Sequence, residues 1–417
     1  MFTTLITFII ILGILVFVHE LGHFWTAKKL GLTPKEFGFG FPPRIFGMQK
    51  IKGVQRSLRE QSEDIEISAD AEGVRESVSV SSVTETQNFS RWRMVTGAAA
   101  LEREGEEITE AGTIYSLNWL PLGGFVNIGE DEEAGNDPRH FKNQKPWKRV
   151  VILSAGVAMN LAVAAVFITW GFMLGLPQTL DEVPAGAHIR ERHVQILQVL
   201  PGSPAEQAGL QMGDVIASID GRTFTSEAGV QDYVAGKAGE TLTYDIRRGS
   251  EEMKIPITLT KLASTGEAGA GIAIAETGIV SLPWYRAIWE GIKATVIMTW
   301  FIITAFVALL YKLLAGAGVS ADIAGPVGIA VMTGQVARLG FVYLLQFAAM
   351  LSINLAIINF LPFPALDGGR VVFVIIEKIR GRAVSEKLET ALHNIGFVLL
   401  ILLVLGVTYR DVLRFWN

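Results

Sequence analysis

The sequence predicts a polytopic α-helical membrane protein with a membrane-associated β-hairpin and an extracytoplasmic α+β domain. Half of the 417 residues are apolar, and the mean hydropathy is positive at +0.38. About four apolar runs are long enough to cross a bilayer as helices. A polar stretch with alternating strand patterns separates the second run from the third. We therefore expect about four transmembrane helices with soluble parts between them.

The composition excludes several kinds of site and partner. The 36 Lys and Arg residues against 41 Asp and Glu give a net charge of −5, so no nucleic-acid partner is expected. The chain has no cysteine, which rules out thiolate zinc sites, disulfide scaffolds and cysteine nucleophiles. Any metal must therefore be held by His, Asp or Glu.

The first predicted transmembrane helix, about Thr3–Trp25, lies in residues 1–50 and ends in a metal-binding pattern. Its run Leu5–Val18 is uncharged and has neither a basic n-region nor a cleavage site, so we expect a retained helix rather than a signal peptide. The helix continues into His19-Glu20-Leu21-Gly22-His23.

The spacing of this motif indicates zinc chemistry. Residues four apart on a helix lie on one face about 5–6 Å apart, so His19 and His23 can share one tetrahedral zinc. Glu20 is then close enough to act on water at the metal. The alternative is that both histidines are core residues whose ring nitrogens are hydrogen-bonded to other protein groups. Three such side chains at the end of an apolar span are costly unless they face a metal or a protein interior.

The region between the first two spans has two parts. Residues 51–112 are polar, with Val78–Val83 as the one strand-like run, and the composition allows either a small cytoplasmic β insert or partial disorder. Residues 113–149 are expected to form a membrane-associated hairpin and a linker. Its strands lie around Tyr115–Trp119 and Phe125–Ile128, joined through Pro121-Leu-Gly-Gly124.

The second span, about Val150–Leu176 within residues 150–187, precedes the soluble domain at residues 188–263. Strand patterns are expected at His193–Leu200, Val215–Ile219, Thr241–Arg247 and Met253–Leu259, with short helices at Ala205–Ala208 and Ser226–Ala235. The string from Pro201 to Gly221, with its Gly-Asp and Ile-Asp-Gly elements, resembles the bacterial PDZ domain. Such domains capture an extended peptide at a sheet edge. The alternative is a β-rich spacer.

Basic residues predict the topology. Lysines and arginines follow the first span and precede the second, which places both flanks in the cytoplasm and the soluble domain outside. Residues 340–417 hold the last two spans, about Gly340–Leu361 and Leu392–Val407, around a basic loop. Parity then places the apolar run Ala294–Tyr311, in the 264–339 linker, on the outer surface or in a re-entrant turn with Ile323–Val336.

A third metal ligand is expected at Asp367. Hydrolytic zinc usually has three protein ligands, and the motif supplies two. Asp367 ends the run Asn359-Phe-Leu-Pro-Phe-Pro-Ala-Leu-Asp, in which Pro362 and Pro364 break the helix. Broken backbone at membrane depth is tolerated where it is buried in protein or lines a wet cavity. The alternative is that Asp367 caps the following helix.

Together these motifs resemble the site-2 protease family of intramembrane zinc metalloproteases, in its bacterial RseP-type branch. The resemblance covers the chain outside residues 51–112. It implies that His19, His23 and Asp367 hold one zinc ion and that Glu20 is the general base. Two differences stand out: Val157 follows Ala155-Gly156 where relatives often have proline before Asn160, and one PDZ domain is expected where some relatives have two.

The resemblance also implies a supporting set of residues. The hairpin run Leu-Gly-Gly-Phe-Val matches the family's strand that receives the substrate, and asparagines near the site match residues that hold substrate or orient the intermediate. The expected supporting residues are Asn354, Asn359, Pro362, Pro364, Gly124, Phe125 and Val126.

The expected function is hydrolysis of peptide bonds within or near the transmembrane helix of a single-span membrane protein. By resemblance, the substrate classes are anti-sigma factors, other membrane-anchored regulators and remnant signal peptides, and the location is the bacterial inner (cytoplasmic) membrane. Whether another protease cuts first stays open, as does whether the PDZ domain filters or recruits substrates. A transporter and a PDZ adaptor without catalysis are the rival interpretations. We find no inverted repeat for a transporter, and an adaptor has no use for Glu20.

Overall fold

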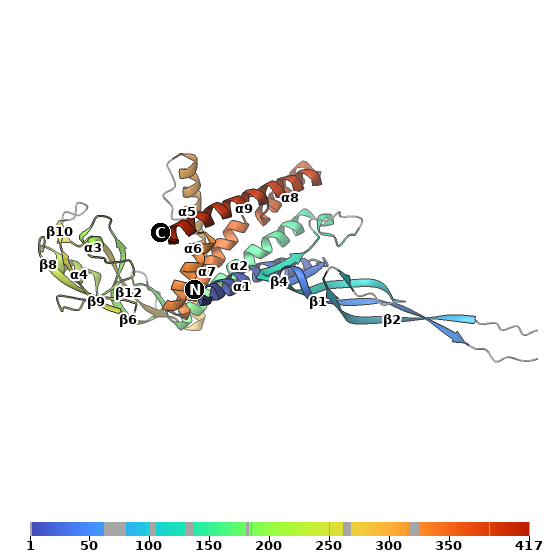
Figure 1. Ribbon diagram of the computed structural model, residues 1–417, viewed down its shortest axis with the longest axis horizontal. Coiled ribbons are helices and arrows are strands. Elements are labelled where there is room, and N and C mark those ends of the chain that lie inside the picture. The colour runs from blue at the N-terminus through green and yellow to red at the C-terminus, as the bar shows by residue number, and fades with distance from the viewer. Residues whose placement is uncertain are drawn as a thin grey trace, which may run out of the picture. The chain divides into compact units, whose positions relative to one another are not determined.

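The computed structural model describes residues 2–61, 81–97, 99–100, 106–129, 137–180, 183–184, 186–249, 251–261, 268–316, 325–382 and 384–416. The chain forms two compact units. One unit contains residues 8–160 and 358–403, and the other contains residues 1–7, 161–357 and 404–417. Figure 1 shows the helices and strands of both units, coloured along the chain.

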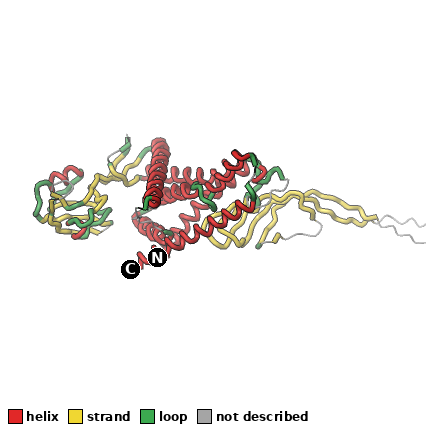
Figure 2. Tube along the Cα trace, turned by 90° about the horizontal axis from the view of Figure 1, so that it is seen from above, coloured by secondary structure: helices red, strands yellow, loops and turns green. Residues whose placement is uncertain are grey.

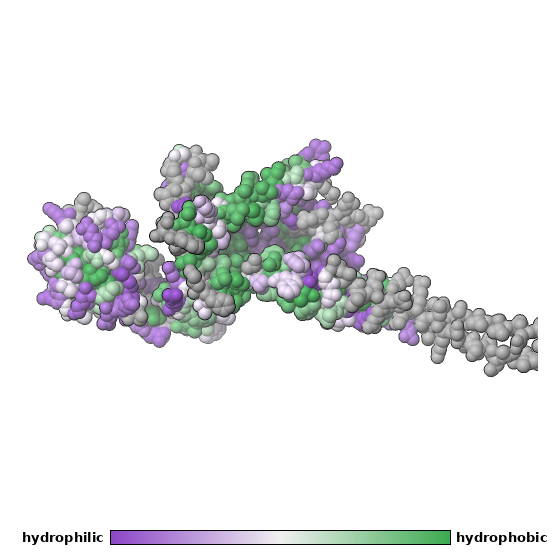
Figure 3. Space-filling model, viewed as in Figure 1, coloured by the Kyte–Doolittle hydropathy of each residue, from purple (hydrophilic) through white to green (hydrophobic). Residues whose placement is uncertain are grey.

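Five described helices are long and apolar enough to cross a membrane, which makes this a multi-pass membrane protein. They are α1 (Phe2–Lys29), α2 (Pro146–Leu174), α5 (Trp284–Leu314), α7 (Phe341–Asn359) and α9 (Glu386–Trp416). Hydrophobic side chains cover the visible face of α9, as expected for a helix in contact with lipid (Figure 3). The expected count of four spans is not confirmed, because α5 also meets the length and hydropathy criteria.

Helix α5 contains the apolar run Ala294–Tyr311, for which a surface position or a re-entrant turn with Ile323–Val336 is expected. It is a single helix of 31 residues without a break. It packs along α2: a Cβ on Gly291 would lie closer than 3.0 Å to Thr169, and Leu161 and Ile303 line one shallow apolar groove. The shorter α6 (Pro326–Leu339) follows it.

The sheet of the first unit has the strand order β3-β2-β1-β4. Its strands are β1 (Glu36–Gln61), β2 (Ser81–Thr96), β3 (Ala99–Ala100) and β4 (Glu106–Asn127), and the three long ones run side by side (Figure 2). Part of the 51–112 insert is therefore β-structure. Much of Val78–Val83 lies outside the described residues.

The expected hairpin in residues 113–129 is wrong in its pairing. Residues 114–117 and 124–127 both belong to β4, and both pair with Glu36–Phe39 of β1, which consequently lies between them. The sequence did not reveal this insertion, because Gly40 and Pro42-Pro43 mark a turn after Glu36–Phe39 but do not say which strands pair. Residues 124–127 are left at the edge of this part of the sheet.

The PDZ-like domain contains a six-stranded sheet with the order β5-β12-β6-β7-β8-β9. Strands β6 (His188–Val199), β7 (Val215–Ile219), β8 (Thr241–Arg248) and β9 (Glu251–Thr258) and helices α3 (Pro204–Gln207) and α4 (Glu227–Val234) lie where the sequence predicts them. Strands β5 (Leu176–Thr179) and β12 (Ile272–Ser281) extend the sheet beyond the expected range 188–263. Two short strands, β10 (Thr260–Lys261) and β11 (Ala268–Gly269), pair with each other.

The core of this domain explains the Gly-Asp element of its motif. Asp214 is buried and forms a bidentate ion pair with Arg248, with both N–O distances at 2.7 Å. The same carboxylate accepts a hydrogen bond from the backbone N–H of Gln211. Asp214 therefore fixes the loop Gly209–Gly213, because a bidentate arginine pair restricts both partners.

Candidate metal centre

Helices α1 and α2 cross closely at two glycines. A Cβ on Gly22 would lie closer than 3.0 Å to the carbonyl oxygen of Ala155, so a larger residue would force the helices apart. Small residues at a crossing let helix backbones approach in a membrane. The crossing places His19 and His23, one turn apart on α1, against α2, where both are buried.

The side chain of Asp367 joins the two imidazoles. The two Nε2 atoms lie 3.1 Å apart, and Asp367 Oδ2 lies 2.9 Å from His19 Nε2 and 3.3 Å from His23 Nε2. Donor atoms about 2.0–2.1 Å from a tetrahedral zinc lie about 3.3 Å from one another. This cluster of two nitrogens and one carboxylate oxygen therefore fits zinc in both donor type and spacing.

A tight turn between α7 and α8 (Asp367–Arg380) delivers Asp367 to this position. Gly368 and Gly369 pack under backbone carbonyls of residues 360–363, and a Cβ on either glycine would lie closer than 3.0 Å to them. Ala365 adopts a positive φ of 82°, and its N–H donates to Nδ1 of His393. The residue at the N-cap of α8 is Leu366, so Asp367 does not cap this helix as the alternative proposed.

Helix α2 orients both imidazoles with residues at 152, 156 and 160, which share one helix face. His23 Nδ1–H donates to the carbonyl oxygen of Ile152 at 2.8 Å, so in the neutral ring its Nε2 keeps the lone pair for a metal. The fully buried carboxamide of Asn160 lies 3.2 Å from His19 Nδ1. Between them, a Cβ on Gly156 would lie closer than 3.0 Å to both rings.

The edge of the sheet passes beside Glu20. Gly123 and Gly124 pack against Val16 and Phe17 of α1, so closely that a side chain on either glycine would collide or displace its neighbours. The backbone of Val126 then hydrogen-bonds the carboxylate of Glu20. The strand and the candidate base are thus in direct contact.

The structure places the other expected residues as follows. Asn359, the last residue of α7, has its amide nitrogen 3.3 Å from His19 Nε2. Asn354 donates to the carbonyl of Met350 within the same helix. Pro362 and Pro364 lie in the turn before Asp367, and the carbonyl of Pro364 packs against Gly396 of α9. Phe125 follows Gly124 in the edge strand and pairs with Gly38.

Sequence reasoning missed the residues whose roles depend on the helix crossing. Asn160 and Gly156 were noted only as parts of a motif, and Ile152 contributes through its backbone. An ion pair between Arg149 of α2 and Glu377 of α8, at 2.5 Å and largely buried, was also missed. This ion pair fixes α8, the helix that begins with Asp367. In the sequence it was indicated only by one charged residue on an apolar face of each helix.

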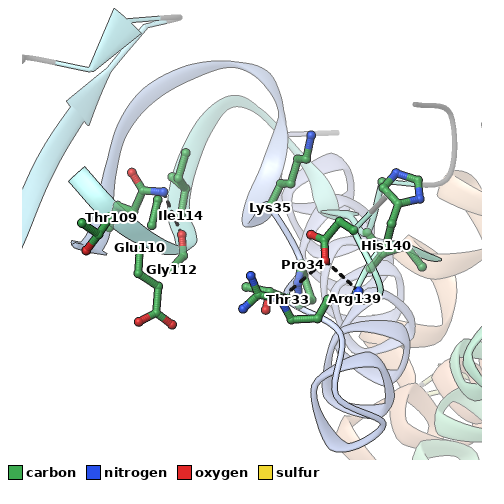
Figure 4. A pocket seen from close by; sticks show the side chains of 14 residues that line it. Thr33, Pro34, Lys35, Thr109, Glu110, Gly112, Ile114, Arg139 and His140 are labelled. Carbon is green, nitrogen blue, oxygen red and sulfur yellow. Dashed lines mark hydrogen bonds and ion pairs between the residues drawn. The ribbon is translucent and has the colours of Figure 1, made fainter. Parts of the chain in front are cut away.

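A separate cavity of about 470 Å³ lies under the sheet and shares no residue with the metal cluster (Figure 4). Glu110, Arg139 and Lys35 give its lining both charge signs. His140 also lines it, and His140 Nδ1 accepts from the backbone N–H of Lys142. Glu110, Asp137 and His140 line this cavity, but among the described residues only the donor atoms of His19, His23 and Asp367 converge closely enough to hold a metal ion.

Comparisons with known proteins identify the family of this chain. The family model described as Peptidase family M50 matches residues 7–59 and 104–403. The zinc metalloprotease RasP of Geobacillus kaustophilus is 30% identical over 99% of this chain and 98% of its own length. The regulator of sigma-W protease RasP of Bacillus subtilis is 32% identical, again over 99% of this chain and 98% of its own length.

Solved PDZ domains are similar to part of the chain. The PDZ domain of the SdrC-like protein from Listeria monocytogenes is 30% identical over 21% of this chain and 92% of that domain, with a TM-score of 0.20.

Proposed function

Because the chain belongs to peptidase family M50 and is an intramembrane zinc metalloprotease of the site-2 type, we propose that one zinc ion binds His19, His23 and Asp367, with Glu20 as the general base. The observation that carries this proposal is the convergence of the three donor atoms within 4.8 Å. They come from sequence positions almost 350 residues apart. Burying two imidazoles and a carboxylate among apolar helices costs free energy unless a cation binds them.

Glu20 moves the proton in the proposed reaction. Its carboxylate takes a proton from the attacking water and returns it to the leaving amine. The hydrogen bond from the Val126 backbone restrains this carboxylate. When bound, zinc supplies Lewis-acid activation of the water and the scissile carbonyl. The amide of Asn359, beside His19, is placed to donate to the developing oxyanion.

The strand 124–127 offers the substrate a backbone to pair with. Asn127 accepts a hydrogen bond from the N–H of Lys35, so its polar groups point into the sheet. Because backbone polar groups alternate in direction along a strand, the N–H and C=O groups of Gly124 and Val126 then point to the open edge. A helical substrate must unwind before hydrolysis, and the N–H and C=O of Gly124 can replace the hydrogen bonds it loses.

Four complete crossings are proposed, with the PDZ-like domain outside the cytoplasm. Gly325, before α6, packs against Val407 and Asp411 near the end of α9, and Gly334 packs against Thr4 at the start of α1. Both contacts lie at helix ends that the basic flanks assign to the outside. Gly325 is therefore placed at the outer face, the same face as the PDZ-like domain that precedes α5. Because the chain starts and ends this stretch on one side, α5 adds no net crossing even though it packs along α2.

The substrates are membrane proteins, and we propose single-span regulators such as anti-sigma factors, or remnant signal peptides. The Bacillus subtilis relative is named a regulator of sigma-W protease, which supports a regulatory substrate. The bacterial cytoplasmic membrane is the proposed location. A protease that trims the substrate first is part of this proposal, because an outer PDZ-like domain above the membrane disfavours bulky substrates.

The direct test is a cleavage assay with detergent-purified protein and a model single-span substrate. Glu20→Gln keeps the shape of the side chain and one accepting oxygen but removes the base. Cleavage should fall at least about 10²-fold while the zinc content stays unchanged. Substantial cleavage by the variant would place the base elsewhere.

A further inference from the structure

Helix α9 supplies a hydrogen-bond partner for the turn that carries Asp367. The backbone N–H groups of Phe363 and Leu366 donate to carbonyl oxygens within this turn. The N–H of Ala365 instead donates to Nδ1 of His393, on α9, at 3.2 Å. Because a backbone N–H is always the donor, Nδ1 is the acceptor, and the proton of the neutral ring is on Nε2.

Ala365 has a backbone conformation that needs support from its surroundings. Its φ of 82° lies in the left-handed region, which alanine rarely adopts and glycine adopts without strain. The other described non-glycine residues with positive φ, Glu191 and Asp220, belong to the PDZ-like domain. A strained residue keeps its conformation only where other groups hold it. Ala365 precedes Asp367 by two residues, so a change in its φ would displace the Asp367 carboxylate.

The backbone of α9 also packs against this turn. His393 and Gly396 are three residues apart, so they lie on the same face of α9. A Cβ on Gly396 would lie closer than 3.0 Å to the carbonyl oxygen of Pro364. Pro364 directly precedes Ala365. Helix α9 therefore holds two consecutive residues of the turn, one by close packing and the other by a hydrogen bond.

The same face of α9 lies near α8 beyond Asp367. Arg370 follows Asp367 by one helical turn, and Glu389 precedes His393 by one turn on α9. Burial lowers the pKa of the Arg370 guanidinium, and the nearby carboxylate of Glu389 raises it. Helix α9 thus borders the chain on both sides of the third metal ligand.

We propose that His393 is a positioning residue for the metal centre, because its Nδ1 holds Ala365 in the left-handed conformation and so keeps the Asp367 carboxylate against the two imidazoles. This inference rests on the proposed role of Asp367 as a zinc ligand. The carboxylate lies 2.9 Å and 3.3 Å from the two imidazole nitrogens, so the three donors are already in place. Movement of the turn would separate them and weaken zinc binding.

Three substitutions at position 393 distinguish positioning from packing. His393→Asn can place its Oδ1 near the position of Nδ1, His393→Gln carries its amide one bond further, and His393→Leu has no acceptor. Zinc affinity of the full-length purified protein is measured by competition with a chelator. It should stay within about twofold of the wild type in His393→Asn and fall about tenfold in the other two. The d–d spectrum of the cobalt-substituted protein should change in the same two variants.

Two further variants provide a control and a rescue. Asn394→Leu alters the neighbouring exposed position on α9 and should leave zinc affinity unchanged. Ala365→Gly removes the strain that the hydrogen bond opposes, since glycine adopts positive φ readily. Added to His393→Leu, it should restore zinc affinity to within about threefold of the wild type, and packing alone predicts no such coupling.

Three results would overturn the proposal: equal losses in all three variants at position 393, wild-type affinity in His393→Leu, or no recovery with Ala365→Gly. If His393→Leu does not fold, the comparison of His393→Asn with His393→Gln still decides. Zinc content in Asp367→Ala separates this inference from the proposed site. Zinc retained there means that the ligand set itself is wrong. Zinc lost there, with unchanged affinity in the variants at 393, removes only the positioning role.

Discussion

Gly156 of α2 lies directly against His23 of α1, so that a Cβ at this position would lie closer than 3.0 Å to the imidazole Nε2. The same Cβ would press on the ring of His19. The glycine thus keeps open the space in which the donor atoms converge. The glycine also lets the two helices approach, because a Cβ on Gly22 of α1 would lie 3.0 Å from the Cα of Gly156. Its backbone freedom costs stability relative to alanine.

Gly156→Ala should disrupt the metal centre without unfolding the protein. The added methyl group must displace both imidazoles, and we expect zinc affinity to fall on the scale of about 10–100-fold, as for loss of a supporting contact. Zinc affinity is measured by competition with a chelator. Gly406→Ala in α9 is the matched control, since nothing lies within 4 Å of its Cβ. Equal affinities in the two variants would contradict the steric role.

Asn160 is proposed to orient His19 by accepting its Nδ1 hydrogen. The oxygen and nitrogen of a carboxamide are interchangeable in position, so the amide oxygen can face the ring at 3.2 Å. Asn160→Leu should weaken zinc binding about 10–100-fold, and Asn160→Asp, which keeps the acceptor, should restore most of it. Similar loss in both variants would indicate a packing role instead. The d–d spectrum of the cobalt-substituted protein provides a second readout.

The proposed topology can be read from two single-cysteine variants in intact cells. A cysteine at Ser226, at the start of α4, should react with an impermeant reagent from outside, and one at Ser385, before α9, should not. A cysteine at Ala315, at the end of α5, reports where that helix finishes. Outside labelling of both Ser226 and Ser385 would make α5 a full crossing.

Deleting the PDZ-like domain separates filtering from recruitment. The sheet includes β5 and β12, so the deletion should leave those strands and remove about 200–270. If the domain acts as a filter, the deletion variant should cleave substrates with bulky outer domains. It should also cleave short substrates at the normal rate. We favour filtering, because the loop Gly209–Gly213 carries no charged anchor for a peptide carboxylate. Slower cleavage of short substrates, without a gain on bulky ones, would favour recruitment.

The sequence predicts local patterns well and tertiary pairings poorly. The spacing of His19 and His23 and the broken helix before Asp367 pointed to residues that the structure brings together, because each pattern is a constraint along the chain. The insertion of Glu36–Phe39 between two parts of β4 was missed because strand partners come from elsewhere in the sequence. The contacts of Asn160 and Gly156 were missed because they exist only where α2 crosses α1.

The central claim is that His19, His23 and Asp367 hold one zinc ion, and zinc content per chain tests it most directly. Elemental analysis of purified protein should give about one zinc in the wild type and in Glu20→Gln. His23→Ala and Asp367→Ala should lose most of it while still inserting into the membrane. Full zinc occupancy in Asp367→Ala would contradict the account, because the third ligand would then lie elsewhere.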